Sequence, residues 1–357
     1  MSHQFGTSLS ALAIVAAAVS LTAGAAAGQA GAAKPKAKKA AATKMWTPLL
    51  TPDGQPDLQG VWLSNSATPL ERPKALEGRQ FLTDEEVREL KKRGDRIFKD
   101  GNSDFASGDN AFLAAFGNVE QYKNPNISTG SSLEMVEREF DNRTSLIVDP
   151  PDGRIPPLTA EARQRQAAEA ARQRLPAGPE DVGNGLRCIT YGVPRLGGNF
   201  GAGPYSYYQI LQSPGYVALT MEVAHDTRII PLDGRPHLSQ SIRQWNGDSR
   251  GRWVGKTLVV DTTNFSPNSY FMGSAENLHL VERFTRVGSD TIKYEITLDD
   301  PTTWTKPWTA AIRLKQTHDK IYEWACHEGN HYVMEGMLAG ARAQEKVAEE
   351  AARKSTK

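Results

Sequence analysis

The sequence predicts a mainly β protein, an antiparallel β-barrel or sandwich with a few peripheral helices and a C-terminal helix. Three observations predict it: apolar and polar residues alternate over the C-terminal half, short turn signals separate these runs, and no helical segment lies between them. Short connections without crossovers pair strands antiparallel. A long twisted sheet then curls into a barrel, of which a lipocalin-like form is one option, or splits into a sandwich.

The alternation is clearest in residues 217–223 and 292–298, where every second residue is apolar. This is the pattern of a strand with one buried face. Gly255-Lys256 and Gly288-Ser289 lie between apolar runs and indicate hairpin turns. Counting segments between turns gives about nine or ten strands from residue 186 onward.

Helical signals are few. Residues 83–99 begin with Thr83 and Glu86 at capping-box spacing, and residues 159–175 begin with a Thr but are polar all round, which predicts a surface helix. Residues 332–353 predict a closing helix. Residues 101–130, rich in Asn, Gly and Ser, predict a long loop.

The N-terminus sets the expected compartment. Residues 9–27 are apolar and end in small residues, the pattern of a signal peptide over 1–27 cleaved near Ala27. No Lys or Arg precedes the run, so an uncleaved anchor is the alternative. Residues 28–45, Ala and Lys with one Pro, predict a disordered linker. We expect a periplasmic or secreted protein with no stable membrane span after cleavage.

The rest of the chain divides into three predicted parts. Residues 46–185 are an N-terminal region of peripheral helices and loops that packs on the barrel, residues 186–331 are the antiparallel β domain, and residues 332–357 are the C-terminal helix. The 42 basic and 41 acidic residues give a net charge of +1. Such a balance leaves no basic footprint for nucleic acid, so we expect no nucleic-acid partner. The sequence sets no oligomeric state.

Cys188 and Cys326 lie far apart and form no CxxC pair. In an oxidising compartment they could form one disulfide. Two buried thiols are the alternative, and spacing alone does not decide between them.

Three ionisable residues fall on apolar faces by the two-residue period. They are His225, Glu282 and Glu328. An inward carboxylate has to be paired, hydrogen-bonded or protonated. One interpretation is an acid–base site in a shared cavity, with His327 at its rim. The other is structural ion pairing with an arginine such as Arg228.

Residues 327–331 match the zinc motif H-E-x-x-H. The motif needs a regular helix through all five residues. Gly329 and Asn330 disfavour a helix, and the preceding residues alternate like a strand. We therefore predict no bound zinc and no other cofactor.

Candidate ligand-binding residues come from the aromatic side chains of the predicted barrel and two basic groups near its turns. They are Tyr208, Trp304, Trp324, Arg228 and His237, with Tyr205, Tyr207 and Trp308 as further lining candidates. A pocket of aromatics with a few polar groups suits a small, partly apolar molecule. Three functions stay open: an acid–base enzyme, a ligand-binding or interaction module, and a zinc hydrolase.

Four segments carry a family resemblance: residues 56–62 (PDLQGVW), 225–237 (HDTRIIPLDGRPH), 255–262 (GKTLVVDT) and 326–330 (CHEGN). With them the chain resembles a large, mostly uncharacterised family of exported proteins with acidobacterial and sphingomonad-like members. The resemblance covers nearly all of the chain after residue 45 and implies no activity. Tyr often follows the Gly-Asn in that family, whereas this chain has His331, which makes the H-E-x-x-H match an accident of one added His.

Overall fold

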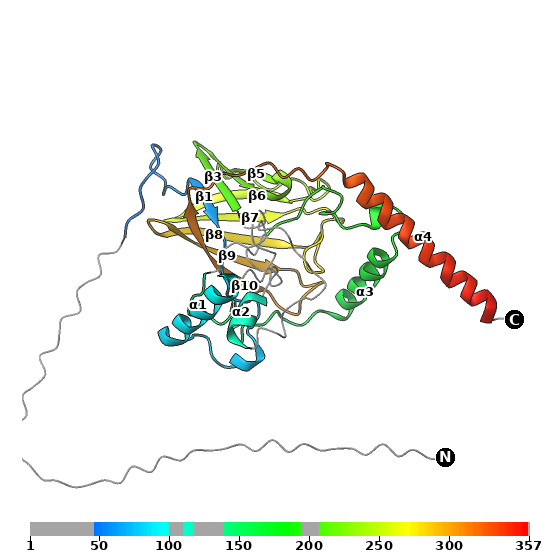
Figure 1. The fold of residues 1–357 in the computed structure, drawn as a ribbon. Helices are drawn as coiled ribbons and strands as arrows, with labels where there is room; N and C mark the ends of the chain where they lie inside the picture. The colour runs from blue at the N-terminus through cyan, green and yellow to red at the C-terminus, as the bar shows by residue number, and fades with distance from the viewer. Residues whose placement is uncertain (1–45, 100–109, 118–138, 195–206, 356–357) are drawn as a thin grey trace, which may run out of the picture. The chain divides into compact units, whose positions relative to one another are not determined.

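The computed structural model describes residues 46–99, 110–117, 139–194 and 207–355 (Figure 1). The predicted signal peptide, the predicted linker and Tyr205 lie outside these residues. Residues 46–357 form one compact unit. None of the helices in the described part of the chain combines the length and apolar character of a membrane span.

A single antiparallel sheet makes up the fold. Its strands follow the order β5-β4-β3-β1-β10-β9-β8-β7-β6, and the short β2 pairs with β10 beside this path. The strands are β1 (Gly60–Leu63), β2 (Ile147–Asp149), β3 (Tyr207–Ser213), β4 (Tyr216–Met221), β5 (Thr227–Pro231), β6 (Asp248–Val254), β7 (Thr257–Thr263), β8 (His279–Gly288), β9 (Thr291–Asp299) and β10 (Trp308–Thr317). The hairpins predicted at Gly255 and Gly288 join β6 to β7 and β8 to β9.

The sheet curls into a nearly closed barrel, because its two end strands meet. A Cβ on Gly251 of β6 would lie 2.5 Å from Leu232 Cδ2 and 2.8 Å from Ile230 Cγ2. The backbone of β6 therefore packs directly on side chains of β5 and the residue after it. No hydrogen-bonded ladder joins these two described strands. The predicted antiparallel β class with peripheral helices is confirmed, in its barrel form.

The barrel interior is a continuous core. Alternate residues of the strands point inward, as the two-residue period predicts, and large aromatic side chains fill much of the space. Trp62, Tyr208, Tyr294, Phe284, Trp304 and Trp308 are each at most 2% exposed. The core belongs to one cluster that runs from β1 to β10.

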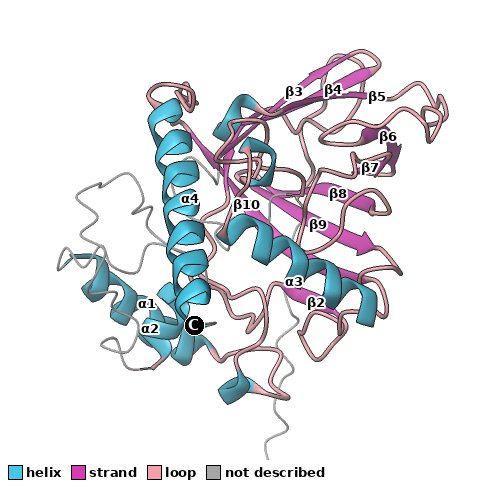
Figure 2. Ribbon diagram, turned by 90° about the vertical axis from the view of Figure 1, so that its right-hand side faces the viewer, coloured by secondary structure: helices cyan, strands magenta, loops and turns pink. Residues whose placement is uncertain are grey.

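The helices largely match their sequence signals. They are α1 (Asp84–Lys99), α2 (Asn110–Phe116), α3 (Ala160–Arg174) and α4 (Asn330–Ser355). The predicted capping box is present at α1, where Glu86 N donates to Thr83 Oγ1 and Thr83 N donates to the Glu86 carboxylate. α1 and α2 lie together (Figure 2) around a small second core that includes Leu90 and Phe112.

Three sequence predictions about elements need correction. The segment predicted as a long loop contains α2. The C-terminal half of the described chain holds eight strands, β3 to β10, instead of nine or ten. The N-terminal region does more than pack on the barrel, because β1 lies inside the sheet between β3 and β10.

Candidate binding cleft outside the barrel

A cavity lies beside the barrel. A cleft of about 600 Å³ is lined by α3, by the segment 182–192, by the turn 267–270 and by Trp245. Cavities of this size accommodate small organic molecules.

The first wall, α3, is fixed at its N-terminus. Thr159 caps the helix by accepting a hydrogen bond from Ala162 N at 3.0 Å, and its hydroxyl donates to Thr302 O at 2.8 Å. Two turns further along the helix, Gln166 Nε2 donates to Met272 O at 3.0 Å. These contacts attach a polar surface helix to the loops at the end of the barrel.

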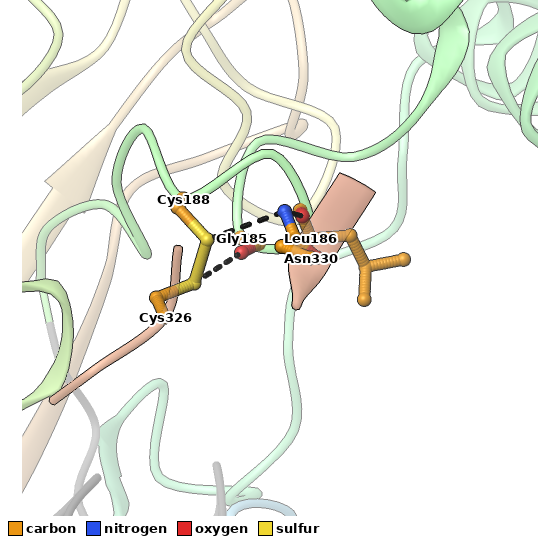
Figure 3. Close-up of a disulfide and its surroundings, with 5 residues drawn as sticks. All are labelled: Gly185, Leu186, Cys188, Cys326 and Asn330. Atoms are coloured by element: carbon orange, nitrogen blue, oxygen red, sulfur yellow. Dashed lines mark hydrogen bonds between the residues drawn. A yellow bond between two sulfur atoms is a disulfide. The ribbon is translucent and has the colours of Figure 1, made fainter. Parts of the chain in front are cut away.

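The second wall, segment 182–192, is held by a disulfide. Cys188 bonds to Cys326, which settles the alternative that the sequence left open (Figure 3). Asn330, the first residue of α4, donates to Leu186 O at 2.7 Å beside the bridge. The disulfide therefore joins a cleft wall to the segment that leads into the C-terminal helix.

A buried carboxylate fixes the inner end of the same wall. Asp226, 8% exposed, accepts hydrogen bonds from Thr190 Oγ1 at 2.8 Å, from Tyr191 N at 3.2 Å and from Asn246 Nδ2 at 3.1 Å. Asn246 follows Trp245 in the sequence. One carboxylate thus holds two sides of the cleft together.

Further hydrogen bonds join the remaining walls. Asn184 Nδ2 donates to Asn268 O at 2.8 Å, and Ser269 Oγ donates to Trp245 O at 2.6 Å. The cleft is therefore preorganised by side-chain contacts between loops that are distant in sequence, a condition that lowers the entropic cost of binding.

Aromatic surface is available in the cleft. Trp245 is 37% exposed and Tyr270 is 50% exposed, and Tyr191 also lines the cleft. Burial, and secondarily the Glu169 carboxylate, raises the pKa of Tyr270. Its phenol therefore keeps its proton at neutral pH and can donate a hydrogen bond to a ligand.

A second polar cluster lies on the outer face of β6, β7 and β8. His237 bonds Asp248 through Nδ1 at 3.0 Å and Asp261 through Nε2 at 3.0 Å, and His279 Nε2 bonds the other oxygen of Asp261 at 3.1 Å. Arg250 Nη1 donates to Asp248 at 2.6 Å. The cluster fastens the loop between β5 and β6, which carries Trp245 at its far end.

Of the predicted site residues, Glu282 and Arg228 meet each other. Arg228 donates from Nη1 and Nη2 to the two carboxylate oxygens of Glu282, at 2.5 and 2.9 Å, and Tyr294 donates its hydroxyl to Glu282 at 2.5 Å. Both charged side chains are almost fully buried. Burial first, and then the Glu282 carboxylate, raises the pKa of Tyr294 well above its usual value. This is the structural ion pair that the sequence offered as the alternative to catalysis.

The predicted shared cavity is wrong, because the other groups lie elsewhere. Chain reversal at Ala224 and His225, with φ of 57° and 53°, ends the inward alternation, and His225 is exposed. Its Nε2 accepts a hydrogen bond from Trp324 N at 2.9 Å. Glu328 and His327 are also exposed, in a turn and not in a strand. The fully buried Glu282 cannot share a cavity with them.

The helix required by H-E-x-x-H is absent at residues 327–331. Gly329 has φ of +71°, and α4 begins only at Asn330. His327 and His331 therefore do not lie one turn apart on a helix. In the described part of the chain, no three His, Cys, Asp or Glu side chains are grouped as metal ligands.

The predicted aromatic lining residues mostly belong to the core. Trp304 and Trp308 form an edge-to-face pair with ring centres 5.6 Å apart, and Tyr208 packs edge-on to Tyr294 at 6.4 Å. Trp324 lies nearer the cleft, edge-to-face with Tyr191 at 6.4 Å. Tyr207 instead donates its hydroxyl to Asp319 at 3.0 Å. The prediction that aromatic residues line a pocket within the barrel fails for Tyr208, Trp304 and Trp308, because these inward side chains fill the space themselves.

The cleft residues Arg187, Trp245 and Tyr270 were missed. They lie in irregular segments, where no periodicity separates buried from exposed positions. A signal was present, since Trp245 and Tyr270 are large aromatics within runs of polar and turn residues. Exposed aromatics in such loops are typical of binding surfaces.

Comparisons with known proteins find one partial similarity, to a solved structure. No family model and no curated protein matches the chain. Among solved structures, the chain is similar to a "secretary abundant heat soluble (SAHS) protein" from Ramazzottius varieornatus, with 13% identity over 34% of this chain and 76% of that chain and a TM-score of 0.24. The barrel assignment rests on the strand pairing and not on this likeness.

Proposed function

We propose that the protein is an exported β-barrel protein that binds a small, partly apolar molecule in the cleft beside its barrel. The observation that carries the proposal is the preorganised cleft itself, with exposed aromatic surface at Trp245 and Tyr270. Open aromatic surface is costly in water and becomes favourable when a ligand covers it. Export is supported by the N-terminal apolar run and by the disulfide, a bond typical of oxidising compartments.

The barrel interior is a poorer candidate for the ligand. Its central ionisable groups, Arg228 and Glu282, form an ion pair with each other, and the surrounding aromatics are packed. Acid–base catalysis by His225, Glu282 and Glu328 is not proposed, since the three groups are separated. The barrel acts as the rigid support, and the loops and α3 form the binding site.

A ligand-observed NMR screen of small ring-containing fragments tests the proposal. Hits should bind the native protein and lose at least about tenfold in affinity in Trp245→Ala, because truncating a central aromatic of a site commonly costs this much. Trp46→Ala is the matched control, since Trp46 is also 37% exposed but does not line the cleft. An absence of hits, or hits indifferent to Trp245, would refute the proposal.

A further inference from the structure

The cleft contains a guanidinium group, that of Arg187, for which the described residues supply no hydrogen-bond or ion-pair partner. Arg187 is half-buried and lines the cleft. Its side chain makes no hydrogen bond or ion pair with any residue in the described ranges. Arginine heads that are partly withdrawn from water are normally paired with a carboxylate or other anion. Among the described residues, therefore, none occupies the donors of the Arg187 guanidinium, and we infer that a ligand takes them.

The other charged residues of the lining are either paired with each other or exposed to water. Arg172 is ion-paired to Glu169 along α3, and Gln173 Nε2 donates to the same carboxylate at 2.7 Å. Glu180 is exposed at the rim, with its carboxylate folded against Gly178. Water screens an exposed charge of this kind more strongly than it screens a half-buried one. Glu169, whose charge reaches Tyr270, is paired with Arg172, whereas Arg187 is half-buried and has no such partner among the described residues.

The aromatic side chains define what else the ligand should carry. Tyr191, Trp245 and Tyr270 line the same cleft as Arg187. Aromatic faces and edges stack on flat unsaturated rings, and a planar guanidinium binds a carboxylate through two parallel hydrogen bonds. The phenol of Tyr270 adds a neutral donor.

We propose that the cleft takes a small aromatic carboxylate, with its ring against Trp245 and Tyr270 and its carboxylate at Arg187. The inference rests on the proposed function, because it assigns the ligand class of the same site. An aromatic cage could alternatively hold an organic cation, but an unpaired arginine inside the cleft would repel it. An aromatic carboxylate matches both features of the cleft, because Arg187 binds its charge and the aromatic side chains bind its ring.

The test compares three probes that share one ring system: naphthalene-2-carboxylate, naphthalene-2-carboxamide and naphthalen-2-ylmethylammonium. Titration of the full chain after export, followed by tryptophan fluorescence and calorimetry, gives each dissociation constant. We expect the carboxylate in the millimolar range or tighter, as suits a ligand of this size. The amide should bind about tenfold or more weakly, and the ammonium weakest, because the charge-assisted pair is lost.

Two arginine variants connect the preference to one side chain. Arg187→Gln should abolish the preference for the carboxylate and lower the affinity for the amide much less, because the amide carbonyl loses a weaker hydrogen bond. An unchanged circular dichroism spectrum shows that the variant is folded. Arg174→Gln is the matched control, because it makes the same charge change on an exposed residue of α3 that does not line the cleft. It should change neither affinity by more than about twofold, the effect of distant screened charge.

The outcomes separate the two proposals. Equal binding of carboxylate and amide, strongest binding of the ammonium, or an Arg187→Gln effect common to all probes would overturn the ligand class and leave small-molecule binding in place. Binding of none of the three probes would also overturn the ligand class. The fragment screen with Trp245→Ala then decides the proposed function by itself.

Discussion

At the scale of single residues, the interior of the barrel contains a buried ion pair between Arg228 and Glu282. Glu282 is 0% exposed and its carboxylate accepts from Arg228 and Tyr294. Removing each charge from water costs several kcal/mol, and the attraction and hydrogen bonds of a well-arranged pair offset most of this desolvation cost. The pair therefore adds little net stability, but neither member can be removed alone without leaving the other unpaired.

We predict that Glu282→Gln lowers the free energy of unfolding by about 3 to 5 kcal/mol, the cost of an uncompensated buried charge. The double variant Arg228→Met/Glu282→Leu should recover most of this loss. Urea unfolding followed by circular dichroism measures both. Glu295→Gln is the control, since Glu295 pairs with Lys293 at the surface and should cost at most about 1 kcal/mol. A single-variant loss no larger than the control would contradict the account.

The outer polar cluster makes the free energy of unfolding depend on pH, and the pKa shifts give the direction of this dependence. The hydrogen bond between His279 and Asp261 raises the pKa of His279 above its usual 6.5 and lowers the pKa of Asp261 below its usual 3.8. The raised pKa of His279 contributes stability that is fully present below about pH 6.5 and is lost as pH rises through the folded-state pKa. The lowered pKa of Asp261 contributes stability above about pH 3.8, which is lost on acidification.

We therefore predict that His279→Gln is destabilising near pH 5.5 and close to neutral near pH 9. The difference should be between about 0.2 and 1 kcal/mol, because both groups are partly exposed and screened. Urea unfolding at the two pH values measures it. His318→Gln, at an exposed histidine without a bonded carboxylate among the described residues, should give the same small effect at both. If His279→Gln lost more unfolding free energy at pH 9 than at pH 5.5, the predicted direction of the pH dependence would be wrong.

At the scale of elements, sequence signals were reliable where the chemistry is local. The Thr and Glu of the α1 capping box, the Thr159 cap of α3 and the glycine turns between strands were all readable, because each acts within a few residues. Period two failed at residues 225 and 328 for a local reason as well. Positive φ at Ala224, His225 and Gly329 ends the alternation. At Ala224 the residue type does not predict a positive φ, because alanine rarely adopts one.

The disulfide is the element-scale contact that connects the cleft to the C-terminal helix. Cys188 and Cys326 are separated by 138 residues. Closing a loop that long restricts the unfolded chain strongly. We predict that Cys188→Ser/Cys326→Ser lowers the free energy of unfolding by about 2 to 4 kcal/mol and weakens fragment binding to the cleft.

Thermal unfolding and the fragment titration measure the two effects of this double variant. Reduction of the native protein under non-denaturing conditions should weaken binding in the same way. Cleft affinity that is unchanged in both the variant and the reduced protein would contradict a supporting role of the bridge for the segment 182–192.

At the scale of the whole molecule, the barrel is nearly closed, and side chains of β5 and of the residue after it pack against the backbone of β6. Gly251 leaves no room for a side chain against Ile230 and Leu232. We predict that Gly251→Val lowers the free energy of unfolding by at least about 2 kcal/mol, because overpacking at a tight backbone contact forces the strands apart. Gly340→Ala is the matched control, with no atom near its Cβ position in α4, and should be neutral or stabilising. Chemical unfolding of both variants provides the measurement, and equal stability would contradict the closure.

The arrangement of the whole molecule was only partly predictable. The two-residue period and short turns predicted an antiparallel barrel or sandwich, because these patterns are local to the chain, and they did not decide between the two forms. The insertion of β1 between β3 and β10 and the assembly of the cleft from α3, Trp245 and the turn 267–270 depend on long-range contacts. Asp226 illustrates the point, because its partners Thr190 and Asn246 lie 36 and 20 residues away.

We propose that the ligand site lies outside a barrel whose interior is filled. A crystal structure of the protein soaked with a hit from the fragment screen tests it most directly. We expect density for the fragment between α3, the segment 182–192 and the turn 267–270, in contact with Trp245. The Arg228–Glu282 pair should be unchanged. Density for the fragment within the barrel, against Tyr294 or in place of the Arg228–Glu282 contact, would contradict it.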